Sequence, residues 1–361
     1  MNILEVYYEP RMSGITRHVG QFVPELEGED LKFHVLCSTD DRRIPSFYRS
    51  HGIPVKRVPG AKYFSFRGML ELIRLVKKWR IDVVHIHNLQ SVFWSSLPKI
   101  LLPRTVFLFT PHIIVFENKT IERVFYLVWR FFSILTREII ALSKEQKTRL
   151  VKLGIKRRDR IRTIYNTVPG NKAGKRTEEK SPFPSDAFCI LSLIRLVRQK
   201  NPEQIIHIAE QVCESHPNAR FFIAGEGPLK RLLRRIIACH ELTDRVILLG
   251  YRPDALELIR EADLLLSTSL WEGLPYTILE AMSMGCPVVA SDIEGHRPLV
   301  VNGETGFLAG TTEEFVQKII LLIGDENMKR EMGKKAGKRF ERYFSFSRFL
   351  ESMKNLYLSF R

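Results

Sequence analysis

Short apolar runs alternate along the chain with longer amphipathic segments, and this alternation restricts the fold more than any other feature. In the first half, runs rich in β-branched and aromatic residues predict strands at 2–8, 33–37, 83–87, 106–110 and 138–141. Helical periodicity between and after them predicts helices at 15–26, 66–78, 121–135 and 144–153. Strands that alternate with helices form parallel sheets covered by helices, so we predict an α/β fold.

A polar stretch at 169–187, rich in Gly, Pro, Lys and Glu, interrupts the pattern and is typical of a linker. The alternation then resumes, with expected strands at 190–193, 219–224, 246–249, 264–267 and 288–290 and expected helices at 202–215, 229–239, 255–261 and 276–284. A chain of 361 residues is longer than one core usually supports. We therefore predict two Rossmann-like, doubly wound domains, at 1–168 and 188–344, with the segment at about 345–361 packing back on the first. Ligands of such sheets bind beyond the carboxyl ends of the strands, so we expect the site in a central cleft that both domains face.

Positive charge is concentrated in the first half of the chain. Residues 1–170 carry 29 Lys and Arg against 15 Asp and Glu, whereas the remainder is nearly balanced. Between Arg42 and Arg80, eleven cations face a single acid, Glu71. Such a surface attracts anionic partners, for example phospholipid headgroups or a pyrophosphate-linked acceptor, although it can also serve solubility alone.

Other bulk features point to a reducing compartment. The five cysteines are dispersed and show no C-x-x-C spacing, which suits neither a disulfide framework nor a zinc site. The first residues lack a basic segment followed by an apolar run, so we expect no secretory signal. No apolar stretch reaches the roughly 20 residues that a membrane helix needs. We expect a cytoplasmic protein, peripheral on the cytoplasmic face of the membrane.

The densest motif is S-L-W-E-G-L-P-Y-T-I-L-E-A-M-S-M-G-C-P-V-V-A, at 269–290. It predicts a loop, a helix that begins near Pro275 and ends at Gly285, and a strand. Glu272 in the loop and Glu280 in the helix can both face the helix N-terminus, whose free N–H groups favour a phosphate. Two carboxylates there are suited to hydroxyl groups of a sugar and a ribose.

A second motif, R-L-V-R-Q-K-N at 195–201, directly follows the first strand of the second domain. Arg195 and Lys200, presented from one loop, can bind both phosphates of a nucleotide diphosphate and neutralise the leaving group. No D-x-D pair occurs in the sequence, so the common aspartate–metal arrangement for diphosphates is absent. We therefore predict a metal-independent enzyme without a cofactor.

Together these motifs resemble the E-x7-E and G-R-L-x-x-x-K signatures of the retaining glycosyltransferases of family four, and the resemblance covers nearly the whole chain. It implies a GT-B fold and transfer of a hexose or N-acetylhexosamine from a UDP- or GDP-sugar, as in polysaccharide biosynthesis. It also implies that Glu272 contacts the donor sugar, that Glu280 holds the ribose, and that the amides of Gly273 and Leu274 meet the diphosphate or sugar. Pro275 adjoins them but has no N–H. One departure is Ile194, where glycine is usual.

Further positions resemble the same family more weakly. His112 in T-P-H is similar to a position where an imidazole reaches the donor sugar, so it is a second catalytic or positioning candidate beside Glu272. Gly14 lies in a loop similar to the family's paired-glycine loop, with Ser13 in place of one glycine. Gly225 and Tyr251 complete the predicted donor side. His85 and His87 share a strand face, so metal binding is conceivable, but a third ligand is lacking, and packing and hydrogen bonding are favoured.

The segment 62–80 mixes aromatic and aliphatic residues with cations and can either pack on the first sheet or lie on an anionic membrane. Its cations Arg67, Arg74, Lys77 and Lys78 are the predicted acceptor or membrane side. The expected partners are a nucleotide-sugar, a glycan or lipid-linked acceptor and an anionic membrane surface. Two alternatives stay open, a sugar-nucleotide epimerase of GT-B type and a non-enzymatic basic binding protein. The sequence lacks an interleaved aromatic and basic motif for nucleic acid, so we expect no such partner.

Overall fold

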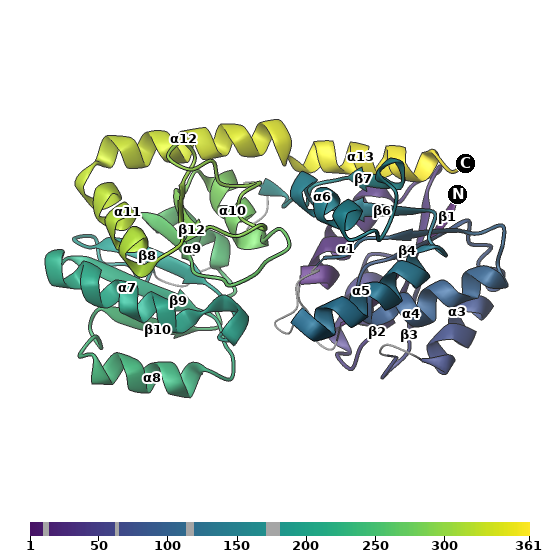
Figure 1. The fold of residues 1–361 in the computed structure, drawn as a ribbon, viewed down its shortest axis with the longest axis horizontal. Helices are drawn as coiled ribbons and strands as arrows, with labels where there is room; N and C mark the ends of the chain where they lie inside the picture. Colours follow the sequence, from purple (N-terminus) through teal and green to yellow (C-terminus); the bar gives the residue numbers. More distant parts are fainter. Residues whose placement is uncertain (10–13, 62–64, 113–118, 171–180) are drawn as a thin grey trace. The chain divides into compact units, whose positions relative to one another are not determined.

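The computed structural model describes residues 1–9, 14–61, 65–112, 119–170 and 181–361, which form two compact units. The first unit comprises residues 1–166 and 347–361, and the second comprises 167–346. The expected domain limits were 168 and 344. Each unit contains one parallel sheet covered by helices, as the alternation predicts (Figure 1).

The sheet of the first unit has seven strands in the order β3-β2-β1-β4-β5-β6-β7, and all pairs are parallel. The order reverses between β1 and β4, so the sheet is doubly wound. Its strands are β1 (Asn2–Tyr8), β2 (Lys32–Ser38), β3 (Val55–Arg57), β4 (Val83–Ile86), β5 (Val106–Phe109), β6 (Glu138–Ala141) and β7 (Ile161–Thr163).

Helices cover both faces of this sheet. The helices are α1 (Gly14–Leu26), α2 (Arg43–Ser50), α3 (Phe66–Lys78), α4 (Leu89–Ser96), α5 (Lys119–Ser133), α6 (Lys144–Lys152) and the C-terminal α13 (Phe346–Leu358). Several begin where the sequence offers a cap: the side chains of Ser65, Asn88 and Ser143 each accept a hydrogen bond from a backbone N–H three residues later. The rings of Phe22 in α1 and Phe349 in α13 lie in contact, and Tyr357 packs against Phe33 of β2. The end of the chain thus belongs to the core of the first unit.

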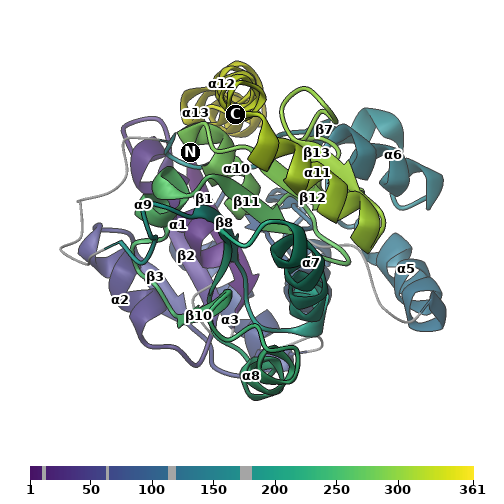
Figure 2. The ribbon, with the colours of Figure 1, turned by 90° about the vertical axis from the view of Figure 1, so that its left-hand side faces the viewer.

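The second unit has six parallel strands in the order β10-β9-β8-β11-β12-β13, with the reversal between β8 and β11 (Figure 2). They are β8 (Phe188–Leu193), β9 (Ala219–Ala224), β10 (Val246–Gly250), β11 (Leu264–Ser267), β12 (Val288–Ser291) and β13 (Phe307–Ala309). The helices are α7 (Pro202–Ser215), α8 (Lys230–Cys239), α9 (Ala255–Glu261), α10 (Tyr276–Met284), α11 (Thr312–Gly324) and α12 (Glu326–Tyr343). Helices α7, α8 and α11 share a core with one face of the sheet, whereas α10 packs with α9 and α12.

Candidate active site

The loop that follows β8 carries both predicted phosphate ligands, and backbone contacts hold it in place. The N–H of Ile194 donates to the carbonyl of Ala224, and the N–H of Leu196 donates to that of Glu226. A Cβ atom on Gly225 would lie 1.8 Å from the carbonyl oxygen of Ile194, so only glycine allows this approach. The isoleucine that replaces the usual glycine is buried in the core of the unit, and its carbonyl is the group that meets Gly225. Gly225 therefore supports the loop, while its predicted role toward the nucleotide remains a prediction.

Lys200 and Glu272, which are 72 positions apart, form an ion pair between the Nζ and Oε1 atoms. Both side chains are largely buried, with 16% and 8% of their surfaces exposed. A buried ammonium and carboxylate require each other, because an unpaired charge in this setting is costly. The pair brings together the two sequence motifs that were expected to form one site.

Four hydrogen-bond contacts fasten the same two loops to each other, and the sequence reasoning missed the residues that make them. The side-chain amide of Gln199 donates to the carbonyl of Trp271 at 2.9 Å, and the N–H of Leu270 donates to the carbonyl of Gln199 at 2.8 Å. The hydroxyl of Thr268 donates to the carbonyls of Lys200 and Asn201, at 3.0 and 2.9 Å. Gln199 and Leu270 lie within the two motifs and Thr268 directly precedes the motif at 269–290, and these positions were the only available signal.

Arg195 is exposed, and its guanidinium donates to the side-chain oxygen of Gln199 at 3.4 Å. Gln199 thus links Arg195 to the loop that carries Glu272. Arg195 is therefore connected, through one neutral side chain, to the backbone carbonyl next to Glu272, and it stays accessible to an anion.

Helix α10 begins after Pro275 and ends at Gly285, which adopts a left-handed conformation with φ of 70°. Glu280 lies on its buried side and is 2% exposed. Leu274 is buried and Gly273 is partly exposed, so the two amides predicted to meet a diphosphate lie in the turn immediately before the helix. Tyr251, just after β10, is 77% exposed.

His296 is a further buried group beside the ion pair that the sequence reasoning missed. Its Nδ1 lies 2.9 Å from the carbonyl oxygen of Ser291, and its Nε2 has no hydrogen-bond partner among the described residues. Burial lowers the pKa of His296 to about 4, although the nearby Glu272 carboxylate opposes that shift. The backbone of Gly295 packs on Glu272 so closely that a Cβ atom would lie 2.6 Å from the Glu272 carbonyl oxygen. The segment therefore supports the backbone of Glu272.

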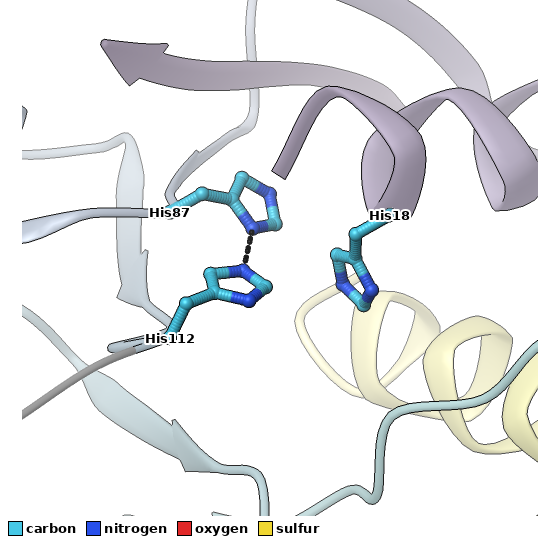
Figure 3. Close-up of side chains that lie close together, drawn as sticks. All are labelled: His18, His87 and His112. Carbon is cyan, nitrogen blue, oxygen red and sulfur yellow. Dashed lines mark hydrogen bonds between the residues drawn. The ribbon is translucent and has the colours of Figure 1, made fainter. Parts of the chain in front are cut away.

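In the first unit, a separate cluster of histidines lies at the carboxyl ends of β4 and β5 (Figure 3). His112 Nε2 lies 3.4 Å from His87 Nδ1, and the ring of His18 in α1 packs edge-on against both imidazoles. The other nitrogen of His87, Nε2, contacts a carboxylate oxygen of Glu5 at 2.5 Å. Loss of hydration lowers the pKa of His18 and His112 well below the usual value and that of His87 to about 3, so all three are neutral at pH 7.

Glu5 is fully buried and connects this cluster to the C-terminal helix. Its carboxylate accepts a hydrogen bond from Tyr357 at 2.8 Å, and Tyr357 also meets His85 at 2.8 Å. Burial raises the pKa of Glu5 to about 7. The expectation that His85 and His87 lack a third metal ligand is wrong, because a carboxylate oxygen of Glu5 and a nitrogen of each of these two histidines lie within 4.8 Å of one another. His18, His87 and His112 form a second group of this kind. Packing and hydrogen bonding nevertheless account for His85, whose other nitrogen faces Thr110 at 2.8 Å.

The remaining predicted residues lie in the first unit. Gly14 is the first residue of α1, while residues 10–13 of its loop lie outside the described residues. Helix α3 buries a stripe that includes Leu72 and Val76. The four predicted acceptor-side cations of α3 are exposed: Arg67, Arg74, Lys77 and Lys78. Packing on the first sheet and binding to an anionic surface are therefore compatible for this helix, since it packs on the sheet and still presents a basic face.

Two models of known protein families match most of the chain. Residues 12–171 match the family model "Glycosyltransferase Family 4", and residues 175–339 match the model "Glycosyl transferases group 1". The chain belongs to the family-four glycosyltransferases. It is 26% identical over 379 aligned positions to UDP-Gal:alpha-D-GlcNAc-diphosphoundecaprenol alpha-1,3-galactosyltransferase of Escherichia coli, with 99% of this chain and 97% of that protein covered. The capsular polysaccharide biosynthesis glycosyltransferase CapM of Staphylococcus aureus is 22% identical, with 93% and 92% covered.

Solved structures confirm the GT-B fold of this glycosyltransferase. Anabaena HepE in complex with UDP and glucose superposes with a TM-score of 0.85 at 20% identity, covering 99% of this chain and all of that one. Sucrose-phosphate synthase from Thermosynechococcus elongatus gives a TM-score of 0.84 at 17% identity, with 99% of both chains covered. In the described part of the glycosyltransferase, no helix is long and apolar enough to cross a bilayer.

Proposed function

We propose that this glycosyltransferase moves a hexose or N-acetylhexosamine from a UDP- or GDP-sugar to a glycan or lipid-linked acceptor, with retention of the anomeric configuration and without a metal. The observation that carries the proposal is the buried Lys200–Glu272 pair in the second unit. An ammonium suited to a diphosphate and a carboxylate suited to sugar hydroxyls are in direct contact there, although they come from different loops.

Each charge has a distinct task in this proposal. Lys200 and Arg195 neutralise the departing diphosphate, which supplies the stabilisation that a metal gives elsewhere. Glu272 orients the sugar, and Glu280 binds the ribose. His112, which is neutral at pH 7, donates or accepts one hydrogen bond at the sugar. Loss of the diphosphate on the same face as acceptor attack accounts for retention, since the leaving phosphate can take the acceptor proton.

The relatives support a lipid-linked acceptor. The Escherichia coli relative is named for transfer from UDP-galactose to a sugar on diphosphoundecaprenol. The basic first half, with the exposed cations of α3, suits a negatively charged, diphosphate-linked acceptor at an anionic membrane surface. We propose that the enzyme works at the cytoplasmic face of such a membrane.

The test is incubation of the purified enzyme with UDP-galactose, UDP-glucose, UDP-N-acetylglucosamine or GDP-mannose and a lipid-diphosphate-linked N-acetylglucosamine. The proposal expects one donor to be consumed in excess EDTA, with an α-linked product identified by NMR. A β-linked product, or strict dependence on a divalent ion, would contradict the mechanism. An isomerised donor in the absence of acceptor would indicate an epimerase, and a gel shift of nucleic acid that survives moderate salt would indicate a binding protein.

A further inference from the structure

A basic pocket of about 730 Å³ lies on the first unit, at the edge of the sheet where β6 and β7 begin. The end of α5 and the segment after α6 form its walls. This is the sheet edge opposite to the histidine cluster, because His87 and His112 follow the ends of β4 and β5. The pocket is therefore separate from the histidine cluster.

Five cations line this pocket: Arg130, Arg137, Lys156, Arg157 and Arg160. Lys156 serves the fold, since its ammonium donates to the carbonyls of Ser133 and Thr136 at the end of α5. Among the described residues, Arg130 and Arg137 take part in no ion pair, and no acidic side chain lines the pocket.

One carboxylate lies beside the pocket. Asp159 meets Arg157 at 3.2 Å and Arg160 at 4.0 Å. One acid cannot offset four guanidinium groups, so the pocket has a strong net attraction for anions.

An apolar stripe adjoins these cations on α5. Leu127 and Phe131 lie four residues apart on one face of α5, and Ile134 follows directly after the helix ends at Ser133. Their exposed fractions are 69%, 64% and 72%. Ile134 also lines the pocket, so the stripe and the cations form one continuous surface. Three large apolar side chains exposed together indicate a surface that is covered in use.

We propose that this surface, the α5 stripe with its basic pocket, docks the protein on an anionic phospholipid bilayer. Headgroup phosphates bind in the pocket, and the side chains of Leu127, Phe131 and Ile134 enter the boundary between headgroups and acyl chains. The bilayer is the expected partner because its negative charge complements the positive charge of the pocket. A second copy paired symmetrically would bring the same guanidinium groups against each other, which opposes a dimer through this face. This surface deepens the proposed membrane association and differs from the basic face of α3.

The experiment is flotation of the full-length protein with vesicles of phosphatidylcholine, with and without phosphatidylglycerol. The wild type is expected to bind only the anionic vesicles. Each cation near such a surface contributes about a factor of five, so Arg137→Gln with Arg157→Gln is expected to weaken binding about thirtyfold. Leu127→Ser with Phe131→Ser is expected to weaken it at least about tenfold, because two apolar side chains no longer leave water.

A matched control removes the same kinds of side chain from α8 of the second unit: Arg231→Gln, Arg234→Gln and Leu232→Ser, all exposed in the wild type. Binding by this control should equal that of the wild type. All substituted positions are on the surface, and unchanged melting temperatures verify folding. These readouts do not require glycosyl transfer, so they can fail or succeed independently of the proposed activity.

Other outcomes would overturn the proposal. The first is that the wild type does not bind anionic vesicles at low salt. The second is that both α5 variants bind fully and binding is lost only when the α3 cations are neutralised. Concentration-dependent dimerisation that Phe131→Ser abolishes would assign the face to a second copy. Stabilisation by inorganic phosphate without vesicle binding would assign the pocket to a soluble anion. Loss of binding in both the α5 and α3 variants would support the α5 surface as one part of a larger membrane face.

Discussion

Replacing Lys200 by methionine tests the central element of the proposed site. The substitution keeps an unbranched side chain but removes the ammonium group that meets Glu272. Hydrogen bonds to charged groups contribute about 1.5–3 kcal/mol, so losing the bond to the departing diphosphate should lower kcat/KM by about 10- to 150-fold.

The same substitution has a separate effect on stability. Glu272, with only 8% of its side chain exposed, is left without its cation. Breaking one side of a buried pair costs about 3–5 kcal/mol, and the residual exposure of both groups places this site at the lower end. Urea unfolding should therefore show a lower midpoint for Lys200→Met. The double variant Lys200→Met with Glu272→Gln should recover part of that stability without recovering activity, because it removes the unpaired charge.

Lys230→Met provides the control. Lys230 pairs with Glu226 on the surface of the same unit, with side chains 28% and 49% exposed, so its pair is worth about 0–1 kcal/mol. Initial rates with the donor and acceptor found for the wild type give kcat/KM for each variant. If Lys200→Met and Lys230→Met had the same kcat/KM as the wild type, the assignment of Lys200 to the diphosphate would be refuted.

Two further predictions concern the histidines. His112→Ala should lower kcat by about three- to tenfold, the effect of one neutral hydrogen bond, and the ratio to wild type should stay constant between pH 6 and 8 because burial keeps the pKa of His112 far below that range; a ratio that changes across this interval would show that a charged imidazole acts. Stability should fall as the pH drops below 6.5. In the folded protein the pKa values of His85, His87 and His296 are about 3, 3 and 4, so these histidines bind protons in the unfolded chain at a pH where they stay neutral when folded. Glu5 opposes this, since its folded pKa of about 7 exceeds 4.5 and it takes up a proton on folding between those values, but one group does not offset three. Each net proton corresponds to about 1.4 kcal/mol per pH unit, and urea midpoints at pH 7 and pH 5 measure it, with a smaller drop expected for His296→Gln; equal midpoints would contradict the prediction.

Local signals explain which elements could be predicted from the sequence. Helix α10 has the predicted bounds, 276–284, because Pro275 and Gly285 mark its two ends. By contrast, α4 (Leu89–Ser96) was not predicted. Apolar and small side chains are spread over all of its faces, so its sequence lacks the alternation of polar and apolar faces that identifies a helix. Helix α2 was also missed, because Pro45 lies in its first turn and the segment is dominated by cations and turn formers.

The candidate site shows a similar division. The pairing of Lys200 with Glu272 follows from two motifs that a parallel sheet brings to the same edge, so the sequence could predict it. The Glu5 cluster could not be predicted in this way. Glu5 occupies an interior strand position where an apolar side chain is expected, and its partner Tyr357 lies 352 residues away. The return of the C-terminal helix to the first unit supplies the Tyr357 hydroxyl, which together with His87 makes this buried carboxyl group tolerable.

The Lys200–Glu272 contact also limits how a donor can bind. Lys200 has one ammonium group, and its buried position allows few partners at once, so a diphosphate would compete with Glu272 for it. A carboxylate that loses a buried cation needs new donors, because an uncompensated buried charge is costly. Sugar hydroxyl groups are such donors, and they arrive attached to the same diphosphate. A nucleotide diphosphate alone would separate the pair without satisfying Glu272, whereas a complete nucleotide-sugar would satisfy both groups. If Lys200 and Glu272 bind the donor as proposed, the pair would therefore favour the intact donor over the product nucleotide, which is the direction of preference that a transferase requires.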